Sequence, residues 1–204
     1  MQLENSMKVY GDIRSGNCYK IKLLASLLDI EYEWIAIDVM SGYTRTPEFL
    51  AMNPNGKIPV LELDDGRHLA ESNAILNYLA DGSELLPDEN FDRAKVLQWQ
   101  FFEQYSHEPS IAVARFIAKF LGMPAERRAE YESLQERGHR ALAVMEQQLE
   151  KTPYLVGERL TIADISLYGY THVAHEGGFD LAGYPAINAW LGRIAAHPKY
   201  AGME

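Results

Sequence analysis

The sequence predicts two domains, a small α/β domain followed by a larger domain built only of helices. In roughly the first 80 residues, short runs of strand-forming residues alternate with apolar residues at helical spacing, whereas helical spacing prevails from residue 91 onward. A turn-rich stretch at 81–92, with Gly82, Pro87 and several acidic residues, separates the two patterns. We therefore expect an α/β domain at 7–82 and an all-α domain at 91–204.

The α/β domain opens with a strand, a helix and a second strand. The strand-like run at 8–10 is followed by a loop and by apolar residues at helical spacing over 21–28. The run at 34–37 is apolar and too short for a helix, which indicates a buried strand. Strands joined through a helix are expected to be parallel, so this part forms a βαβ unit. The pair Thr46-Pro47 then indicates the start of a short helix.

The rest of this domain should contribute a hairpin and a helix. An Asp-Gly pair between two strand-like pieces predicts antiparallel pairing of 60–63 with 67–70. We expect Ser72 to be the N-cap of the next helix, which should end near Ala80. Together with the βαβ unit, these elements give a mixed four-stranded sheet in the order βαβ, helix, ββ, helix.

The second domain shows only helical patterns. Two long segments, 91–121 and 126–151, contain few helix breakers. Thr161 and Asp164 have the spacing of a capping box and mark a helix start. A last helix should begin near Pro185, because proline is favoured in the first turn, and should end near residue 196.

Charge and composition argue against several classes of function. The 29 acidic and 19 basic residues give a formal net charge of −10, which repels nucleic acids and anionic lipid surfaces. The sequence shows neither a long apolar run nor a signal-peptide profile, so we expect a cytoplasmic protein. A lone Cys18 cannot form an internal disulfide, which fits a reducing compartment. The segment before Met7 has no usable pattern and is left out of the fold prediction.

No metal site is expected. His172 and His175 have a spacing that could bring them together on a helix, but only Glu176 lies nearby as a third ligand. A single cysteine also excludes a cysteine-rich zinc module.

The pair Ile58-Pro59 at the head of a strand is a candidate binding element. Proline cannot donate to a sheet, so it belongs at the start of a strand or on an edge, and the bond before it can be cis. A cis bond would turn the Ile58 backbone outward, where it could pair with an extended peptide. An ordinary trans proline that starts a strand is the commoner alternative.

Two helix N-termini offer further candidates. At Glu71-Ser72, free backbone N–H groups suit a ligand carboxylate, while Glu71 could bind an ammonium group. In the loop 14–18, Ser15, Asn17 and Cys18 gather at a second helix start, where anionic sulfur is favoured. From pattern alone, simple helix caps, a solvated acid and a small buried cysteine are the commoner explanation of these residues.

Taken together, order and spacing of these motifs resemble the glutathione S-transferase family from Met7 to about His197. The quoted motifs are Ser15-Gly16-Asn17-Cys18, Asn53-Pro54-Asn55-Gly56-Lys57-Ile58-Pro59-Val60-Leu61, Glu71-Ser72-Asn73-Ala74-Ile75 and Leu155-Val156-Gly157-Glu158 with Leu160-Thr161-Ile162-Ala163-Asp164. The resemblance implies a thioredoxin-like N-terminal domain, an all-helical C-terminal domain, and a cis bond before Pro59. It also implies glutathione as a substrate and a homodimer that acts in detoxification.

The resemblance assigns roles to individual residues. Ile58, next to Pro59, should bind the cysteinyl backbone of glutathione, and Lys57 should lie near the peptide. Glu71 and Ser72 should hold the γ-glutamyl end.

Ser15 and Asn17 are the catalytic candidates. Ser15 matches the catalytic serine of the theta- and delta-like classes, whereas Ser15-Gly16-Asn17 equally resembles the Thr-Pro-Asn of bacterial nu-class relatives that reduce disulfides. The tyrosine used by the alpha, mu and pi classes is not present at this position, so the class and the residue that faces the sulfur stay open.

The expected chemistry is attack by a glutathione thiolate on a small hydrophobic electrophile. If the family arrangement holds, 98–108 runs beside the sulfur, and Tyr105, His107 and Arg115 are candidates for the electrophile pocket. Ordinary helix packing is the competing explanation for these three residues. The alternative functions are a glutathione-dependent disulfide oxidoreductase, in which Cys18 or Asn17 matters more than Ser15, and a non-catalytic glutathione-binding protein.

Overall fold

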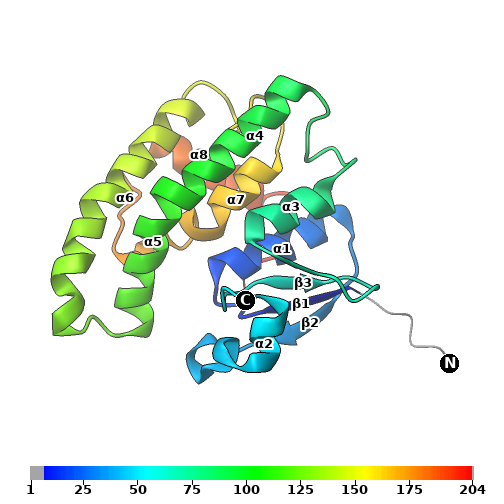
Figure 1. Cartoon of the computed structure of the whole chain (residues 1–204). Helices are drawn as coiled ribbons and strands as arrows, with labels where there is room; N and C mark the ends of the chain where they lie inside the picture. Colours follow the sequence, from blue (N-terminus) through cyan, green and yellow to red (C-terminus); the bar gives the residue numbers. More distant parts are fainter. Residues whose placement is uncertain (1–6, 204) are drawn as a thin grey trace. The chain divides into compact units, whose positions relative to one another are not determined.

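The computed structural model describes residues 7–203, and the segment before Met7 lies outside the described residues (Figure 1). The chain divides into two compact units: one runs to Asp81 and includes the C-terminal segment from Lys199, and the other spans 82–198. None of the helices described is both long and apolar enough to cross a membrane.

The first unit is a thioredoxin-like domain with a mixed four-stranded sheet. Its elements are β1 (Lys8–Gly11), α1 (Gly16–Leu28), β2 (Glu33–Ala36), α2 (Pro47–Met52), β3 (Val60–Glu62), β4 (His68–Ala70) and α3 (Ser72–Ala80). The strand order is β2-β1-β3-β4. The predicted parallel β1–β2 pair and the antiparallel β3–β4 hairpin are both confirmed.

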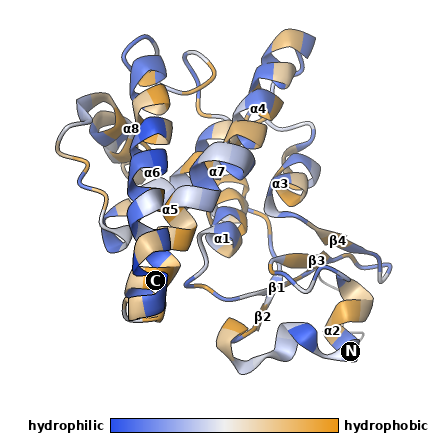
Figure 2. Cartoon of the chain, turned by 60° about the vertical axis from the view of Figure 1, so that its left-hand side comes forward, coloured by the Kyte–Doolittle hydropathy of each residue, from blue (hydrophilic) through white to orange (hydrophobic). Residues whose placement is uncertain are grey.

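Apolar side chains of α1, β3 and α3 form the core of this unit. Helices α1 and α3 pack against each other on one face of the sheet, as both cartoons show (Figures 1 and 2). Leu24 of α1, Leu61 of β3 and Ile75 of α3 are fully buried. This packing holds the N-terminal ends of α1 and α3 in fixed places, and both ends carry candidate residues.

The prediction that Ser72 caps α3 is wrong. Ser72 is the first residue of the helix, and Glu71 occupies the cap position without a side-chain cap bond. The Ser72 hydroxyl instead hydrogen-bonds to side chains of α1, namely Asn17 and Lys20. A tertiary contact has therefore replaced the local cap that the sequence suggested.

The second unit contains only helices. They are α4 (Asn90–Phe102), α5 (Glu108–Arg115), α6 (Arg128–Leu149), α7 (Ile162–Thr171) and α8 (Pro185–Ala195). Two π-helical turns, Glu103–His107 and Phe116–Phe120, follow α4 and α5 and so interrupt the long segment that the sequence predicted as one helix. Figure 2 shows polar and apolar positions mixed along α4 and α6, as expected for helices with one buried face.

Helix α7 is buried along its whole length, and its start is fixed as predicted. The capping box forms between Thr161 and Asp164. The Asp164 carboxylate also accepts hydrogen bonds from the Leu155 N–H and from Nε1 of Trp190 in α8, both at 2.9 Å. A single carboxylate thus ties a loop, a helix start and a second helix together.

Candidate functional site

The loop before β3 carries Lys57, Ile58 and Pro59. The Ile58–Pro59 peptide bond is cis, as expected. The buried Asn53 side chain organises this loop, because its Nδ2 donates to the Lys57 carbonyl at 2.7 Å and its Oδ1 accepts from the Asn55 N–H at 3.1 Å. Lys57 is exposed and Ile58 is half-buried. The backbone at this strand start is therefore held by side-chain hydrogen bonds rather than by the sheet.

Glu71 has an unusual backbone conformation at the start of α3. Its φ of 68° lies in the region that favours glycine, which costs a residue with a side chain about 1–3 kcal/mol. Its side chain is exposed, whereas Ser72 next to it is buried. Such strained residues cluster at ligand sites, so the conformation itself supports a functional role for Glu71.

The N-terminal turn of α1 brings Asn17 to the start of α3. Asn17 Oδ1 accepts a hydrogen bond from Lys20 Nζ at 2.8 Å and another from the Ser72 hydroxyl at 3.3 Å. Asn17 is half-buried. The structure thus joins Asn17, expected near the sulfur, to Ser72, expected near the γ-glutamyl end.

Ser15 is the N-cap residue of α1, but its side chain makes no cap bond. Its backbone N–H donates to the Asp12 carbonyl at 2.9 Å, and its hydroxyl forms a hydrogen bond with the Cys18 side chain. Ser15 is half-buried, so part of the residue is accessible to solvent.

Cys18 is fully buried and is not poised for thiol chemistry. Burial raises the pKa of its thiol to about 12, although the hydrogen bond with Ser15 acts in the opposite direction. A Cβ placed on Gly11 would lie 2.9 Å from the Cys18 sulfur, so the thiol is tightly packed. Because the thiolate is the reactive form, Cys18 fits the structural explanation better than a role in disulfide exchange.

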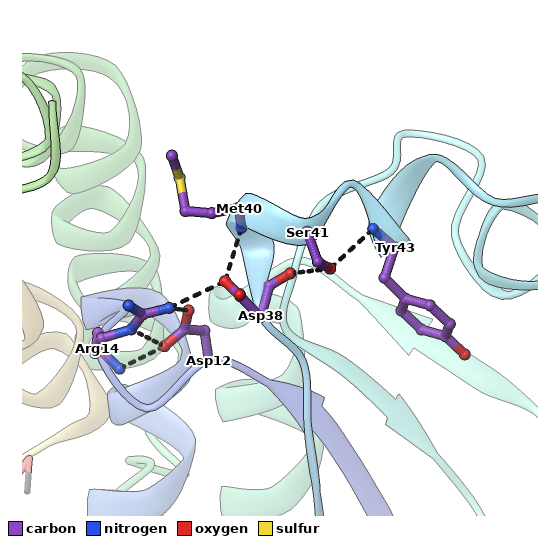
Figure 3. Close-up of polar contacts among 6 residues, drawn as sticks. All are labelled: Asp12, Arg14, Asp38, Met40, Ser41 and Tyr43. Atoms are coloured by element: carbon purple, nitrogen blue, oxygen red, sulfur yellow. Dashed lines mark hydrogen bonds and ion pairs between the residues drawn. The ribbon is translucent and has the colours of Figure 1, made fainter.

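An ion-pair cluster fixes the loop that leads into Ser15 (Figure 3). Arg14 binds Asp12 through two parallel hydrogen bonds, Nε to Oδ1 at 2.9 Å and Nη2 to Oδ2 at 2.6 Å. Arg14 Nη2 also contacts Asp38 Oδ1 at 3.2 Å, after the end of β2. Burial opposes ionisation of Asp12, but its bonds to Arg14 outweigh that effect and lower its pKa. The β1–α1 loop is thereby linked to the chain after β2.

The same cluster continues into the short turns after β2. Asp38 Oδ1 accepts from the Met40 N–H at 2.9 Å, and the Asp38 carbonyl accepts from the Ser41 hydroxyl at 2.7 Å (Figure 3). The Ser41 oxygen in turn accepts from the Tyr43 N–H at 3.3 Å. Sequence reasoning did not single out this network, because Arg14 and Asp38 are 24 positions apart and meet only in the folded chain.

Lys20 is the other residue that sequence reasoning missed. Its side chain is 0% exposed, and its Nζ contacts Asn17 and Ser72. A signal was present in the sequence: Lys20 lies one turn before Leu24 and two turns before Leu27, on the stripe that α1 buries. A lysine on a buried stripe calls for polar partners inside the domain.

The three electrophile-pocket candidates do not come together within the helical unit. Tyr105 is 86% exposed and lines a pocket of about 240 Å³ with residues of α6. His107 is buried, and its Nε2 lies 2.9 Å from the Thr171 hydroxyl oxygen. Because that hydroxyl donates to the Leu167 carbonyl, it accepts from His107. These contacts give His107 a place in the helix packing.

Arg115 is also buried, and it forms an ion pair. Its Nε donates to Glu176 Oε2 at 2.5 Å, and Lys119 Nζ donates to the other carboxylate oxygen at 2.5 Å. Burial opposes ionisation of Glu176, but the two cations outweigh it and lower its pKa. Among residues 7–203, no group of three or more potential metal ligands is close enough to hold an ion.

Family models match both units. A model described as the glutathione S-transferase N-terminal domain matches residues 5–81, and one described as the C-terminal domain matches 110–198. A glutathione S-transferase structure from Pseudomonas fluorescens is 65% identical with a TM-score of 0.96, covering 97% of this chain and 98% of that one.

Two further relatives bear on chemistry. The disulfide-bond oxidoreductase YfcG of Escherichia coli is 33% identical over 189 residues, 89% of this chain and 87% of its own length. A glutathione transferase family member from Pseudomonas fluorescens, solved with two glutathione molecules bound, is 28% identical with a TM-score of 0.84. That match covers 98% of this chain and 92% of the other.

Proposed function

Because the chain belongs to the glutathione S-transferase family, we propose that it binds glutathione and uses its sulfur to attack a small hydrophobic electrophile. The observation that carries the proposal is the junction of Asn17 and Ser72 at the N-terminal ends of α1 and α3. A helix N-terminus carries a partial positive charge and directs backbone N–H groups toward an anion. Two such ends match a ligand with one anionic sulfur and one anionic carboxylate.

We assign the remaining contacts by their chemistry. The γ-glutamyl group has an ammonium, for which the exposed Glu71 carboxylate is suited, and a carboxylate, for which the start of α3 at Ser72 is suited. The backbone of Ile58, beside the cis bond to Pro59, is suited to the extended cysteinyl backbone. Lys57 is exposed at the same loop and can contact the peptide.

The chemical step requires an ionised thiol near neutral pH. A free thiol has a pKa of about 8.5, so lowering it by roughly two units requires about 2.7 kcal/mol. One charge-assisted hydrogen bond contributes about 1.5–3 kcal/mol, and a helix N-terminus about 0.3–1. We propose that the Ser15 hydroxyl donates to the thiolate with support from the Asn17 amide. The thiol proton passes to solvent, a carbon–sulfur bond forms, and the leaving group departs with the bonding electrons.

A disulfide reductase is the second candidate, favoured by the identity with YfcG and by Asn17. There the thiolate attacks a substrate disulfide, so one sulfur–sulfur bond breaks and a mixed disulfide forms. A second glutathione resolves it to oxidised glutathione and the reduced product. The burial of Cys18 supports a reaction in which glutathione, rather than the protein, provides the reacting sulfur.

Of the electrophile-pocket candidates, Tyr105 alone is exposed and is the one we propose for contact with the second substrate. His107 and Arg115 are proposed to support the helices that carry the pocket, through Thr171 and Glu176.

We also propose that the protein is a cytoplasmic homodimer. The lone cysteine fits a reducing compartment. Leu97 and Phe101, one turn apart on α4, are exposed apolar residues, as is Val144 on α6, and a partner subunit could cover them. Light scattering coupled to gel filtration should give twice the chain mass, and a monomer mass would contradict this part of the proposal.

The test is the pH dependence of thiolate absorbance for glutathione bound to the wild type and to Ser15→Ala, Asn17→Ala and Cys18→Ala. A depressed bound pKa that rises only in Ser15→Ala supports serine-type transfer. An effect confined to Asn17→Ala shifts the proposal toward disulfide reduction, which a disulfide substrate assay then checks. Binding without a depressed pKa in any form would identify a non-catalytic binding protein. We expect Cys18→Ala to leave the pKa unchanged.

A further inference from the structure

Lys20 places a buried ammonium group inside the thioredoxin-like unit. Its neighbours on the buried face of α1 are apolar, and Ile21 and Leu24 are fully buried. Removing an ammonium from water is costly unless polar partners surround it. Lys20 Nζ lies 2.8 Å from Asn17 Oδ1 and 3.3 Å from the Ser72 hydroxyl oxygen. A buried charge therefore lies at the junction of α1 and α3, where an apolar residue would have a smaller desolvation penalty.

The chemistry of the three groups fixes their orientation. An ammonium group only donates, so the oxygen ends of Asn17 and Ser72 must face Lys20. The Ser72 hydroxyl then uses its proton toward Asn17 Oδ1 at 3.3 Å, which closes a triangle. With its oxygen directed to Lys20 and Ser72, Asn17 carries its N–H donors on the opposite side of the carboxamide. An asparagine amide can otherwise turn either end toward a ligand.

We propose that Lys20 is a positioning residue for glutathione, and this rests on the proposed function. Its ammonium fixes the donor end of Asn17 for the thiolate and the hydroxyl of Ser72 at the start of α3. It also places a positive charge behind both anionic groups of the ligand, where the low dielectric of the interior strengthens its field. One buried lysine thereby couples sulfur ionisation to carboxylate binding.

The test compares Lys20→Met, Lys20→Gln and the control Lys8→Met. Lys8 is a lysine of the same unit that pairs with Glu62 on the sheet, so its loss removes one charge away from the junction. Binding of S-methylglutathione, which has the carboxylates without a free thiol, is measured by calorimetry. The pKa of bound glutathione is measured by thiolate absorbance. Thermal unfolding reports whether each variant is folded.

We expect Lys20→Met to weaken S-methylglutathione binding about ten-fold, the size of one charge-assisted hydrogen bond, and to raise the bound thiol pKa by about one unit. Lys8→Met should change neither. Lys20→Gln keeps a donor without the charge, so it should bind better than Lys20→Met but still show a raised thiol pKa. If Lys20→Met does not fold, Lys20→Gln still allows both measurements to be made.

The experiment distinguishes failure of the proposed function from failure of the positioning role of Lys20. If the wild type binds no S-methylglutathione, the proposed function fails. If the wild type binds it with a depressed thiol pKa in bound glutathione, and a folded Lys20 variant keeps both values, the positioning role is refuted. A merely structural lysine would lower the unfolding temperature without moving the pKa of the ligand thiol.

Discussion

Replacing Asp164 by alanine should strongly destabilise the helical unit. The Asp164 carboxylate is fully buried. It accepts from the Leu155 N–H, the Thr161 N–H and Trp190 Nε1, each at 2.9 Å, and from the Thr161 hydroxyl at 3.1 Å. Burial raises the pKa of this carboxyl, and the hydrogen bonds act against that rise. Every group around the carboxylate is thus a donor that needs an acceptor.

The magnitude follows from those donors. Alanine leaves three buried N–H groups without their acceptor, at about 1–3 kcal/mol each, for a loss of about 3–9 kcal/mol. Whole domains are stable by only about 5–15 kcal/mol. Asp164→Asn keeps one oxygen, which can still accept hydrogen bonds from Leu155 and Trp190. The free energy of unfolding of this variant should therefore fall by about 1–3 kcal/mol. Thr161→Ala removes a cap hydroxyl and should cost about 1 kcal/mol.

Urea unfolding followed by far-ultraviolet circular dichroism measures the series, with tryptophan fluorescence as a second probe because a two-unit chain need not unfold in one step. The expected order of stability is wild type, then Thr161→Ala, then Asp164→Asn, then Asp164→Ala. An Asp164→Ala protein within about 1 kcal/mol of the wild type would show that water or relaxed neighbours satisfy the donors, and the reasoning would be refuted.

Two further predictions follow from buried titratable groups. Cys18, with its pKa raised to about 12 by burial, should resist iodoacetamide in the native protein and react in guanidinium, as mass spectrometry would show; equal native and unfolded rates would contradict this. Burial lowers the pKa of His172 to about 4. Between pH 6.5 and 4 the unfolded chain therefore binds a proton that the folded chain does not, and stability should fall by about 3 kcal/mol. His172→Phe should flatten this part of the profile of unfolding free energy against pH, and an unchanged slope would argue against the assignment.

Local signals in the sequence predicted most of the fold, because the elements concerned are specified by neighbouring residues. The Asp-Gly pair gave the hairpin of β3 and β4, and the capping box gave the start of α7. The π-helical turns at Glu103–His107 and Phe116–Phe120 were not predictable in this way. Such turns add a residue to a helix whose apolar spacing still appears regular, so periodicity does not reveal them.

In the candidate site, contacts between residues distant in sequence could not be predicted from local sequence patterns. Ser72 was assigned to its own helix as a cap, yet its hydroxyl bonds to Asn17 and Lys20, which lie more than 50 positions away. The sequence motif correctly predicted the cis bond before Pro59, because the family pattern carries that information. It did not include Lys20, since a charged residue acquires its partners only when α1 and α3 pack together.

The same contacts bear on whether Ser15 or Asn17 donates a hydrogen bond to the sulfur of glutathione. The Ser15 hydroxyl bonds to the side chain of the buried Cys18. Lys20 and Ser72 both donate to the oxygen of the Asn17 side chain, so its amide N–H donors are directed away from these two residues. The orientation of the Asn17 carboxamide is thus set within the protein, and preorganised donors stabilise a developing charge without reorganisation at the moment of reaction. The rise in the pKa of bound glutathione in Ser15→Ala and in Asn17→Ala measures how much each side chain stabilises the thiolate.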